Sequence, residues 1–98
     1  RVPHLAAGFQ EAVVEMLTER TLLAARTRGV RQVAVGGGVA CNGRLREVLL
    51  ARGAAAGLEV HFPSPHLCLD NAAMVAGLGF HLLSRGRRAS LDLDACPR

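Results

Sequence analysis

Apolar residues recur along this 98-residue sequence with a helical period in three segments and a strand period between them. Over 5–28 they return every three or four positions, which predicts one long helix. Arg26 and Arg28 would stand in its last turn, and Gly29 would supply the left-handed residue that ends it. The side chains predicted to form its inner face are Leu5, Phe9, Val13, Met16 and Leu17.

Two short segments have the pattern of strands. The run VRQVAVGG, residues 30–37, contains the apolar stretch 33–35 and ends in glycine, as a short buried strand does. The run LEVHF, residues 58–62, alternates apolar and polar residues and predicts that His61 lies on the exposed side. Pro63 and Pro65 follow it and predict a non-helical loop.

Two further helices are predicted after these strands. Asn42 is a good N-cap for a helix over 43–56, with Gly57 as its stop. The residues expected on its inner and flanking faces are Leu45, Val48, Leu49 and Arg52. Asp70 is the expected N-cap of a helix over 71–84, which Gly86 would end. The face expected on that helix consists of Met74, Leu78 and Leu82.

The order helix, strand, helix, strand, helix predicts an α/β unit with two parallel strands joined by a right-handed crossover. Two strands alone make a poor sheet, so we expect further strands from sequence outside these residues. Residues 1–98 are therefore expected to form one unit that is a fragment of a larger domain. The tail, residues 86–98, is expected to be exposed, and its pattern allows one short strand over 90–93.

Composition narrows the class of protein. Half of the residues are hydrophobic but only 3% are aromatic, so Leu, Val and Ala must build the core. The net charge is +4, and all 12 basic residues are Arg. This suits phosphate contacts with a nucleic acid, but a GC-rich coding sequence would produce the same bias.

The cysteines and the absence of long apolar runs suggest a compartment. The three cysteines, Cys41, Cys68 and Cys96, show no CxxC spacing, which argues against a disulfide framework or a cysteine zinc cage. A reducing, cytoplasmic setting is the simpler expectation. No apolar run reaches the roughly 18 residues of a membrane span, so no membrane partner is expected.

The glycine-rich stretch GGGVACN, residues 36–42, follows the first predicted strand and precedes a helix. This layout holds nucleotides and other anions in many α/β proteins. It matches neither GxGxxG nor the P-loop pattern, so a plain structural turn stays open as the alternative. Asn42 could bond a ribose hydroxyl as well as cap the helix.

The stretch PSPHLCLDNAAM, residues 63–74, occupies the corresponding place after the second strand. Asp70 could ligate a metal or a ribose, or it could only cap the helix. His66, Cys68 and Asp70 alternate, and in an extended chain they could share a side and bind zinc or iron. Because the carboxyl ends of parallel strands meet at one edge, Asn42 and Asp70 could face one cleft.

These two stretches together closely resemble the C-terminal part of the TsaD family, the KEOPS-type tRNA N(6)-adenosine threonylcarbamoyltransferases once called O-sialoglycoprotein endopeptidases. The family pattern is a GGV-A-x-N-x-x-LR block, a proline-containing loop, and C-x-DNxAM. The matching segments are GGVACN at 37–42, Leu45-Arg46, and CLDNAAMV at 68–75. The two motifs occur in the family's order, and the resemblance runs over most of the chain.

The resemblance implies a fold and an activity. The fold would be part of the C-terminal lobe of the actin-like ATPase (ASKHA) fold, which actin, sugar kinases and heat-shock ATPases share. The activity would be transfer of threonylcarbamoyl from threonylcarbamoyl-AMP to the adenosine beside the anticodon of tRNAs that read codons beginning with A. The implied partners are tRNA, a paralogous subunit and a small ATPase.

The resemblance also implies site residues. Asn42 would contact the nucleotide, and the glycines Gly36, Gly37 and Gly38 would let the adenylate approach the backbone. Asp70 would ligate one divalent metal, iron or zinc, together with histidines of an N-terminal HxxxH motif. No catalytic side chain is assigned to these residues.

The sequence departs from the family pattern in one respect. It has no HxxxH, because four residues separate His61 from His66, and we therefore expect no turnover from this segment alone. A non-catalytic, actin-like scaffold or partner subunit is the alternative, although such paralogues tend to lose the aspartate that Asp70 matches. The old protease assignment has no HExxH to support it.

Overall fold

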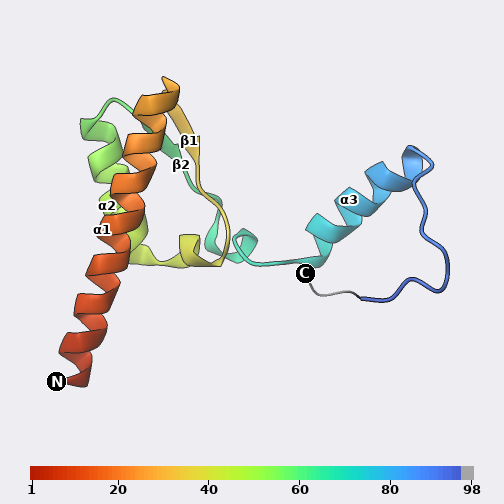
Figure 1. The fold of residues 1–98 in the computed structure, drawn as a ribbon, viewed down its shortest axis with the longest axis horizontal. Helices are drawn as coiled ribbons and strands as arrows, with labels where there is room; N and C mark the ends of the chain where they lie inside the picture. The colour runs from red at the N-terminus through yellow and green to blue at the C-terminus, as the bar shows by residue number, and fades with distance from the viewer. Residues whose placement is uncertain (96–98) are drawn as a thin grey trace.

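The computed structural model describes residues 1–95 and contains three α-helices and a two-stranded sheet (Figure 1). In chain order these are α1 (Val2–Arg28), β1 (Gln32–Ala34), α2 (Gly43–Ala55), β2 (Glu59–His61) and α3 (Ala72–Ser84). Two short 3-10 helices, η1 (Gly38–Cys41) and η2 (Pro65–Leu67), lie in the loops after the strands. The small α/β architecture is as predicted, whereas the 3-10 turns have no counterpart in the prediction.

Helix α1 ends where the sequence predicts and begins earlier. Its first turn starts at Val2 rather than Leu5, because Pro3 has a backbone angle suited to a helix start. Gly29 takes the left-handed conformation with φ of 66°. Its N–H donates to the carbonyl of Arg26 at 3.1 Å, which closes the last turn.

The two strands pair in parallel, as predicted. Val33 lies opposite Val60 in the register, and Ala34 lies opposite His61. The pairing extends beyond the strands, because the Val35 N–H donates to the carbonyl of His61 at 2.9 Å. The imidazole of His61 is exposed, as the alternation predicts, and lies 3.4 Å from a carboxylate oxygen of Glu59. Both strands therefore end at the same edge of the sheet, each followed by a loop.

The buried core forms between α1, α2 and the sheet. Its centre consists of Val14, Leu45 and Leu49, with the half-buried Val60 and Phe62 packed against it. The inner face predicted for α2 is confirmed at Leu45 and Leu49. α2 can lie close to β2 because Gly53 has no side chain, and a Cβ there would stand 2.6 Å from Cγ2 of Val60.

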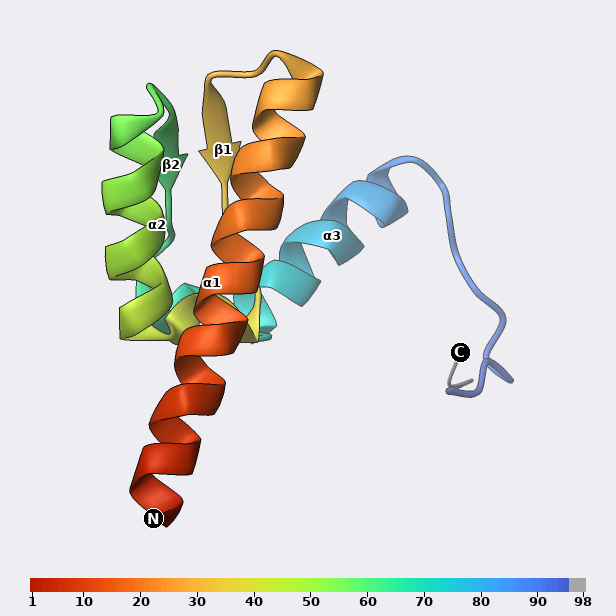
Figure 2. The ribbon, with the colours of Figure 1, turned by 60° about the vertical axis from the view of Figure 1, so that its left-hand side comes forward.

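The inner face predicted for α1 is wrong, because none of its five residues is among the buried ones. Met16 is 53% exposed, and Val13 and Leu17 are only half-buried. Leu5 and Phe9 are each 73% exposed, and the buried residues of this helix begin only at Val14. The reason is geometric, since α1 extends well beyond the end of α2 (Figure 2) and its first turns have no neighbour there. The full set of buried α1 residues is Val14, Thr18, Leu22 and Ala25.

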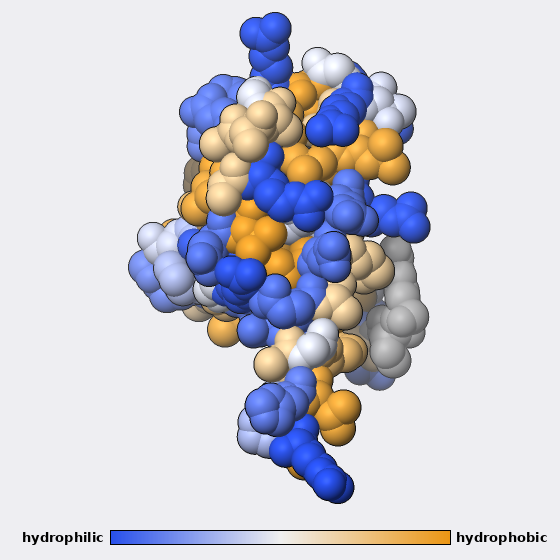
Figure 3. Space-filling model, turned by 90° about the vertical axis from the view of Figure 1, so that its left-hand side faces the viewer, coloured by the Kyte–Doolittle hydropathy of each residue, from blue (hydrophilic) through white to orange (hydrophobic). Residues whose placement is uncertain are grey.

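Ion pairs on the surface also connect α1 with α2. The Arg44 guanidinium donates to Glu11 at 2.8 Å, and this hydrogen bond holds the pKa of Glu11 below its ordinary value. Both side chains are exposed, so the pair is screened by solvent and contributes little. Figure 3 shows the face turned toward the viewer, where apolar side chains lie between charged ones. The helix interface therefore depends mainly on its apolar contacts.

Helix α3 forms over nearly the predicted range but contributes no buried residue. It projects away from the other elements (Figures 1 and 2), and Met74 and Leu78 of its predicted face are 58% and 62% exposed. The radius of gyration is accordingly 18.1 Å, compared with about 13 Å for a compact domain of this length. The tightly packed part is therefore α1, α2 and the sheet.

The tail after α3 is exposed, as predicted, but the strand allowed over 90–93 does not form. The chain turns there instead, and the N–H of Leu93 donates to the carbonyl of Ser90 at 3.3 Å. Cys96 lies outside the described residues. Within residues 1–95 no helix combines the length and the apolar character needed to cross a bilayer.

Candidate functional site

The candidate site lies in the two loops at the carboxyl edge of the sheet, and glycines form the first of them. Gly37 has φ of 93°, a region that other residues rarely adopt, so the turn itself requires glycine there. Gly36 differs in its backbone, which does not have a positive φ, and a Cβ at this position would meet no atom within 4 Å among residues 1–95. A Cβ on Gly38 would make only an ordinary contact, 3.5 Å from Leu69. The backbone at Gly36 is therefore open to a ligand.

Asn42 caps α2, as predicted. Its Oδ1 accepts from the N–H of Leu45 at 2.9 Å, and its Nδ2 donates to Oε1 of Gln10 at 3.1 Å. A primary amide has two donor hydrogens and two acceptor lone pairs, so each end keeps one free position. The side chain can therefore contact a ligand without giving up the cap.

The prediction that Asp70 caps α3 is wrong. The N-cap is Asn71, whose Oδ1 accepts from the N–H of Met74 at 3.0 Å. Asn71 has the extended backbone that this position needs, and the amide fills the role expected of the carboxylate. Asp70 is exposed and forms no hydrogen bond or ion pair within residues 1–95. Its carboxylate is free for another purpose.

The proposed grouping of His66, Cys68 and Asp70 around a metal is also wrong. The chain is not extended there, because residues 65–67 form the 3-10 turn η2. Cys68 is buried, whereas Asp70 is exposed. In the described part of the chain no group of three or more His, Cys, Asp or Glu side chains could hold a metal ion. Asp70 can thus supply one oxygen ligand, but these residues alone do not complete a metal site.

Arg46 joins the two loops. Its Nε donates to the carbonyl of Ala40 in the first loop at 2.6 Å, and its Nη2 donates to the carbonyl of Pro63 in the second at 2.8 Å. Nη2 also lies 3.2 Å from Sγ of Cys68. The guanidinium carbon stands 4.9 Å from the centre of the Phe62 ring, a cation–π distance. One half-buried cation therefore fixes both loops against the end of the sheet.

The cysteines of the two loops meet at the same turn. Cys41 Sγ donates to the carbonyl of Pro65 at 3.3 Å, and the same carbonyl accepts the N–H of Cys68 at 3.1 Å. Burial raises the pKa of the Cys41 thiol, and the charge and hydrogen bonding of Cys68 raise it further. The expectation that the two loops share one edge is therefore confirmed by direct contacts between them.

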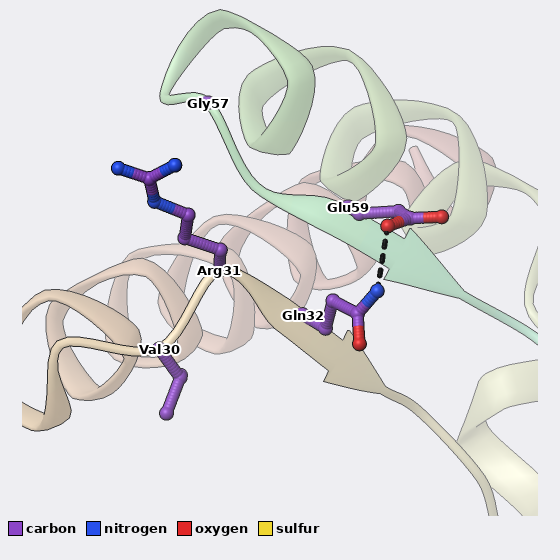
Figure 4. A pocket seen from close by; sticks show the side chains of 5 residues that line it. All are labelled: Val30, Arg31, Gln32, Gly57 and Glu59. Carbon is purple, nitrogen blue, oxygen red and sulfur yellow. Dashed lines mark hydrogen bonds between the residues drawn. The ribbon is translucent and has the colours of Figure 1, made fainter.

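A shallow hollow lies at the opposite edge of the sheet (Figure 4). It has a volume of about 710 Å³ and is lined by Val30, Arg31, Gln32, Gly57 and Glu59. Gln32 and Glu59 are joined across it by a hydrogen bond of 2.8 Å (Figure 4). Ligands of open α/β sheets bind at the carboxyl edge, so we assign the site to the two loops rather than to this hollow.

Sequence reasoning missed two residues of this arrangement. In the sequence Arg46 stands out only as part of the family pattern. Its position along the chain does not show that its side chain donates to carbonyls in two loops. Gln10 stands 32 residues before Asn42 and is brought to it only by the packing of α1 on α2. The Leu45-Arg46 pair of the family pattern is the sequence feature that points to a role for Arg46.

Comparison with known proteins identifies the family of the chain. The family model for tRNA N6-adenosine threonylcarbamoyltransferase, TsaD, matches residues 2–77. Proteins of that name from Symbiobacterium thermophilum and Thermotoga neapolitana are 52% and 50% identical over 95% and 99% of this chain. A third, from Syntrophus aciditrophicus, is 46% identical over 97% of it. The chain belongs to the TsaD family, whose model spans both loops.

The chain spans between 27% and 30% of the length of these relatives. The match includes α1, both strands, both loops and the start of α3. More than two thirds of each relative therefore lies outside the region that matches this chain.

Replacing Arg46 should loosen the two loops. Arg46→Met keeps the apolar stem against Phe62 but leaves the carbonyls of Ala40 and Pro63 without their donor. Because the bonds are charge-assisted and half-buried, we expect a loss of about 2–3 kcal/mol in the free energy of unfolding. Urea unfolding measures the loss, and hydrogen exchange should be faster in the loops than in α1.

Arg52→Met is the matched control, because Arg52 lies on the same helix and reaches only the exposed Glu19 at 3.9 Å. It should cost less than about 1 kcal/mol. Equal losses for the two variants would show that Arg46 does not join the loops.

Proposed function

We propose that the protein containing this chain transfers the threonylcarbamoyl group from threonylcarbamoyl-AMP to the adenosine beside the anticodon of tRNAs reading codons that begin with A. Membership of the TsaD family supports the reaction class. The observation that carries the proposal is that Arg46 contacts Ala40 of the first family motif and Cys68 of the second at the carboxyl edge of the sheet. Residues far apart in the sequence thereby form one wall of a site.

We further propose that this wall belongs to the C-terminal lobe of an actin-like ATPase fold. The parallel strands joined by α2 are consistent with such a lobe, and the exposed end of α1 and the whole of α3 offer apolar surface for the rest of it. The opposite wall of the cleft would then come from the other lobe.

The adenylate would lie against the first loop. The open backbone at Gly36 allows a phosphate or ribose to approach without meeting a side chain. Asn42 keeps one donor and one acceptor position for a ribose hydroxyl while its cap holds the amide in a fixed orientation. The start of α2 nearby adds the positive end of a helix dipole, which favours an anion.

Asp70 would supply one ligand of a divalent metal, iron or zinc, completed by histidines from a further segment of the protein. Its exposed carboxylate is not used by the cap of α3, which supports this role. A metal bound there would polarise the carbonyl or the phosphate leaving group. Arg46 would keep the loop of Asp70 at a fixed distance from the loop of Asn42.

The proposed reaction also implies macromolecular partners and a cellular compartment. The basic balance of the chain, entirely from arginine, suits contacts with tRNA phosphates. A paralogous subunit and a small ATPase would assist the reaction, which would take place in the cytoplasm.

Removing the carboxylate of Asp70 should abolish the modification. Asp70→Asn keeps the size of the side chain but weakens a metal ligand. We expect at least about a 100-fold loss of metal affinity and a corresponding loss of modified adenosine in tRNA. Cells that lack the native transferase, given the full-length gene with or without the change, show whether tRNA is modified, and metal content is measured on the purified proteins.

Glu15→Gln removes an exposed carboxylate elsewhere, on α1, and should leave both readouts unchanged. Undiminished modification by the Asp70→Asn protein would contradict the metal assignment. Absence of this modification activity with the unaltered gene would instead contradict the proposed reaction and favour a scaffold role.

Adding a methyl group at Gly36 should obstruct the adenylate without disturbing the fold. In Gly36→Ala the methyl group meets no atom within 4 Å among residues 1–95, so thermal unfolding should be nearly unchanged. We expect the affinity for AMP to fall about tenfold, equivalent to about 1.4 kcal/mol. Calorimetric titration of the full-length protein measures it.

Gly8→Ala is the control, because a methyl group there also meets no atom and Gly8 lies on the distant half of α1. Equal AMP affinities for the two alanine variants and the unaltered protein would show that the backbone at Gly36 does not contact the nucleotide.

A further inference from the structure

Two thiols that the proposed reaction does not use lie at the contact between the two loops. Cys41 ends η1 in the first loop, and Cys68 follows η2 in the second. They are the free cysteines among residues 1–95, and the 26 residues that separate them in the sequence include all of α2 and β2. Only the packing of the loops brings them together.

Their contacts place both sulfur atoms on one short turn. Cys41 Sγ lies 3.3 Å from the carbonyl oxygen of Pro65, and Cys68 Sγ lies 3.8 Å from that of Ser64. The Cys68 N–H donates to the same Pro65 carbonyl at 3.1 Å.

The two cysteines differ in their exposure to solvent and in their neighbours. Cys68 is only 7% exposed and has the Arg46 guanidinium 3.2 Å from its sulfur. Cys41 is half-buried and can meet a small molecule from solvent. A reagent would therefore reach Cys41 first, with Cys68 positioned behind it.

We infer that Cys41 and Cys68 are a dithiol site at which a low-molecular-weight disulfide, such as oxidised glutathione, forms a reversible bond between the two loops. The Cys41 thiolate attacks one sulfur of the oxidant, the S–S bond of the oxidant breaks, and one glutathione leaves as a thiol. The Cys68 thiolate then attacks the Cys41 sulfur and releases the second glutathione.

The two protein thiols together lose two electrons, and the oxidant gains them as it becomes two thiols. The protons lost by the two cysteines pass to the released glutathione thiolates. The product is one protein disulfide that covalently ties the loop of Asn42 to the loop of Asp70. It also takes the Cys68 sulfur from its place beside Arg46.

The experiment uses the natural full-length protein, equilibrated with mixtures of oxidised and reduced glutathione and then alkylated. Peptides obtained without reduction are identified by mass. We expect a peptide pair linked through Cys41 and Cys68, lighter by two hydrogen atoms than the two peptides together, and its disappearance after reduction. Cys41→Ala should lose this linked pair, whereas the matched variant Cys96→Ala should keep it.

Three results would overturn the inference. These are full alkylation of both cysteines at every glutathione ratio, a stable glutathione adduct on Cys41 that never proceeds to the linked pair, and pairing of either cysteine with a different one. The peptide map of the unaltered protein gives the answer even if a variant fails to fold. None of these readouts depends on the transferase reaction, so failure here is separate from failure of the proposed function.

Discussion

The carboxyl edge of the sheet depends on one half-buried cation. Arg46 of α2 donates to one backbone carbonyl in each of the loops that follow β1 and β2. A lysine could not do this, because a single ammonium lacks the planar set of donors that reaches both loops at once. Phe62 covers the guanidinium, which further restricts its position. The distance between the two family motifs is therefore set by α2, the helix that carries Arg46.

In each loop, a residue with a structural role lies next to a residue that the fold leaves available for a ligand. Gly37 has the backbone conformation that only glycine readily adopts, which leaves Gly36 with no structural reason to be glycine. Asn71 caps α3, and Asp70 has no hydrogen-bond or ion-pair partner within residues 1–95. We expect a ligand contact at a residue whose identity the fold does not require, when the neighbouring residue already meets the structural need. The proposed roles of Gly36 and Asp70 rest on this division.

Much of the fold could be predicted from the sequence, because local signals determine it. The ends of α1 and α2 follow from Gly29 and Asn42, and the alternation in 58–62 gives the exposed side of β2. Burial was harder to predict. The apolar period of α1 identifies a helix, but only the position of α2 decides that burial begins at Val14. The same limit applies to the site, since contacts from Arg46 to both loops depend on packing rather than on spacing.

The central claim is that the two loops, and not the hollow at the other edge, receive the adenylate. Hydrogen exchange of the full-length protein with and without AMP tests this most directly. We expect slower exchange on binding at residues 36–42, extending to 68–72, and no change at residues 30–32 and 57–59. Protection confined to the residues around the hollow, with none in the glycine loop, would contradict it.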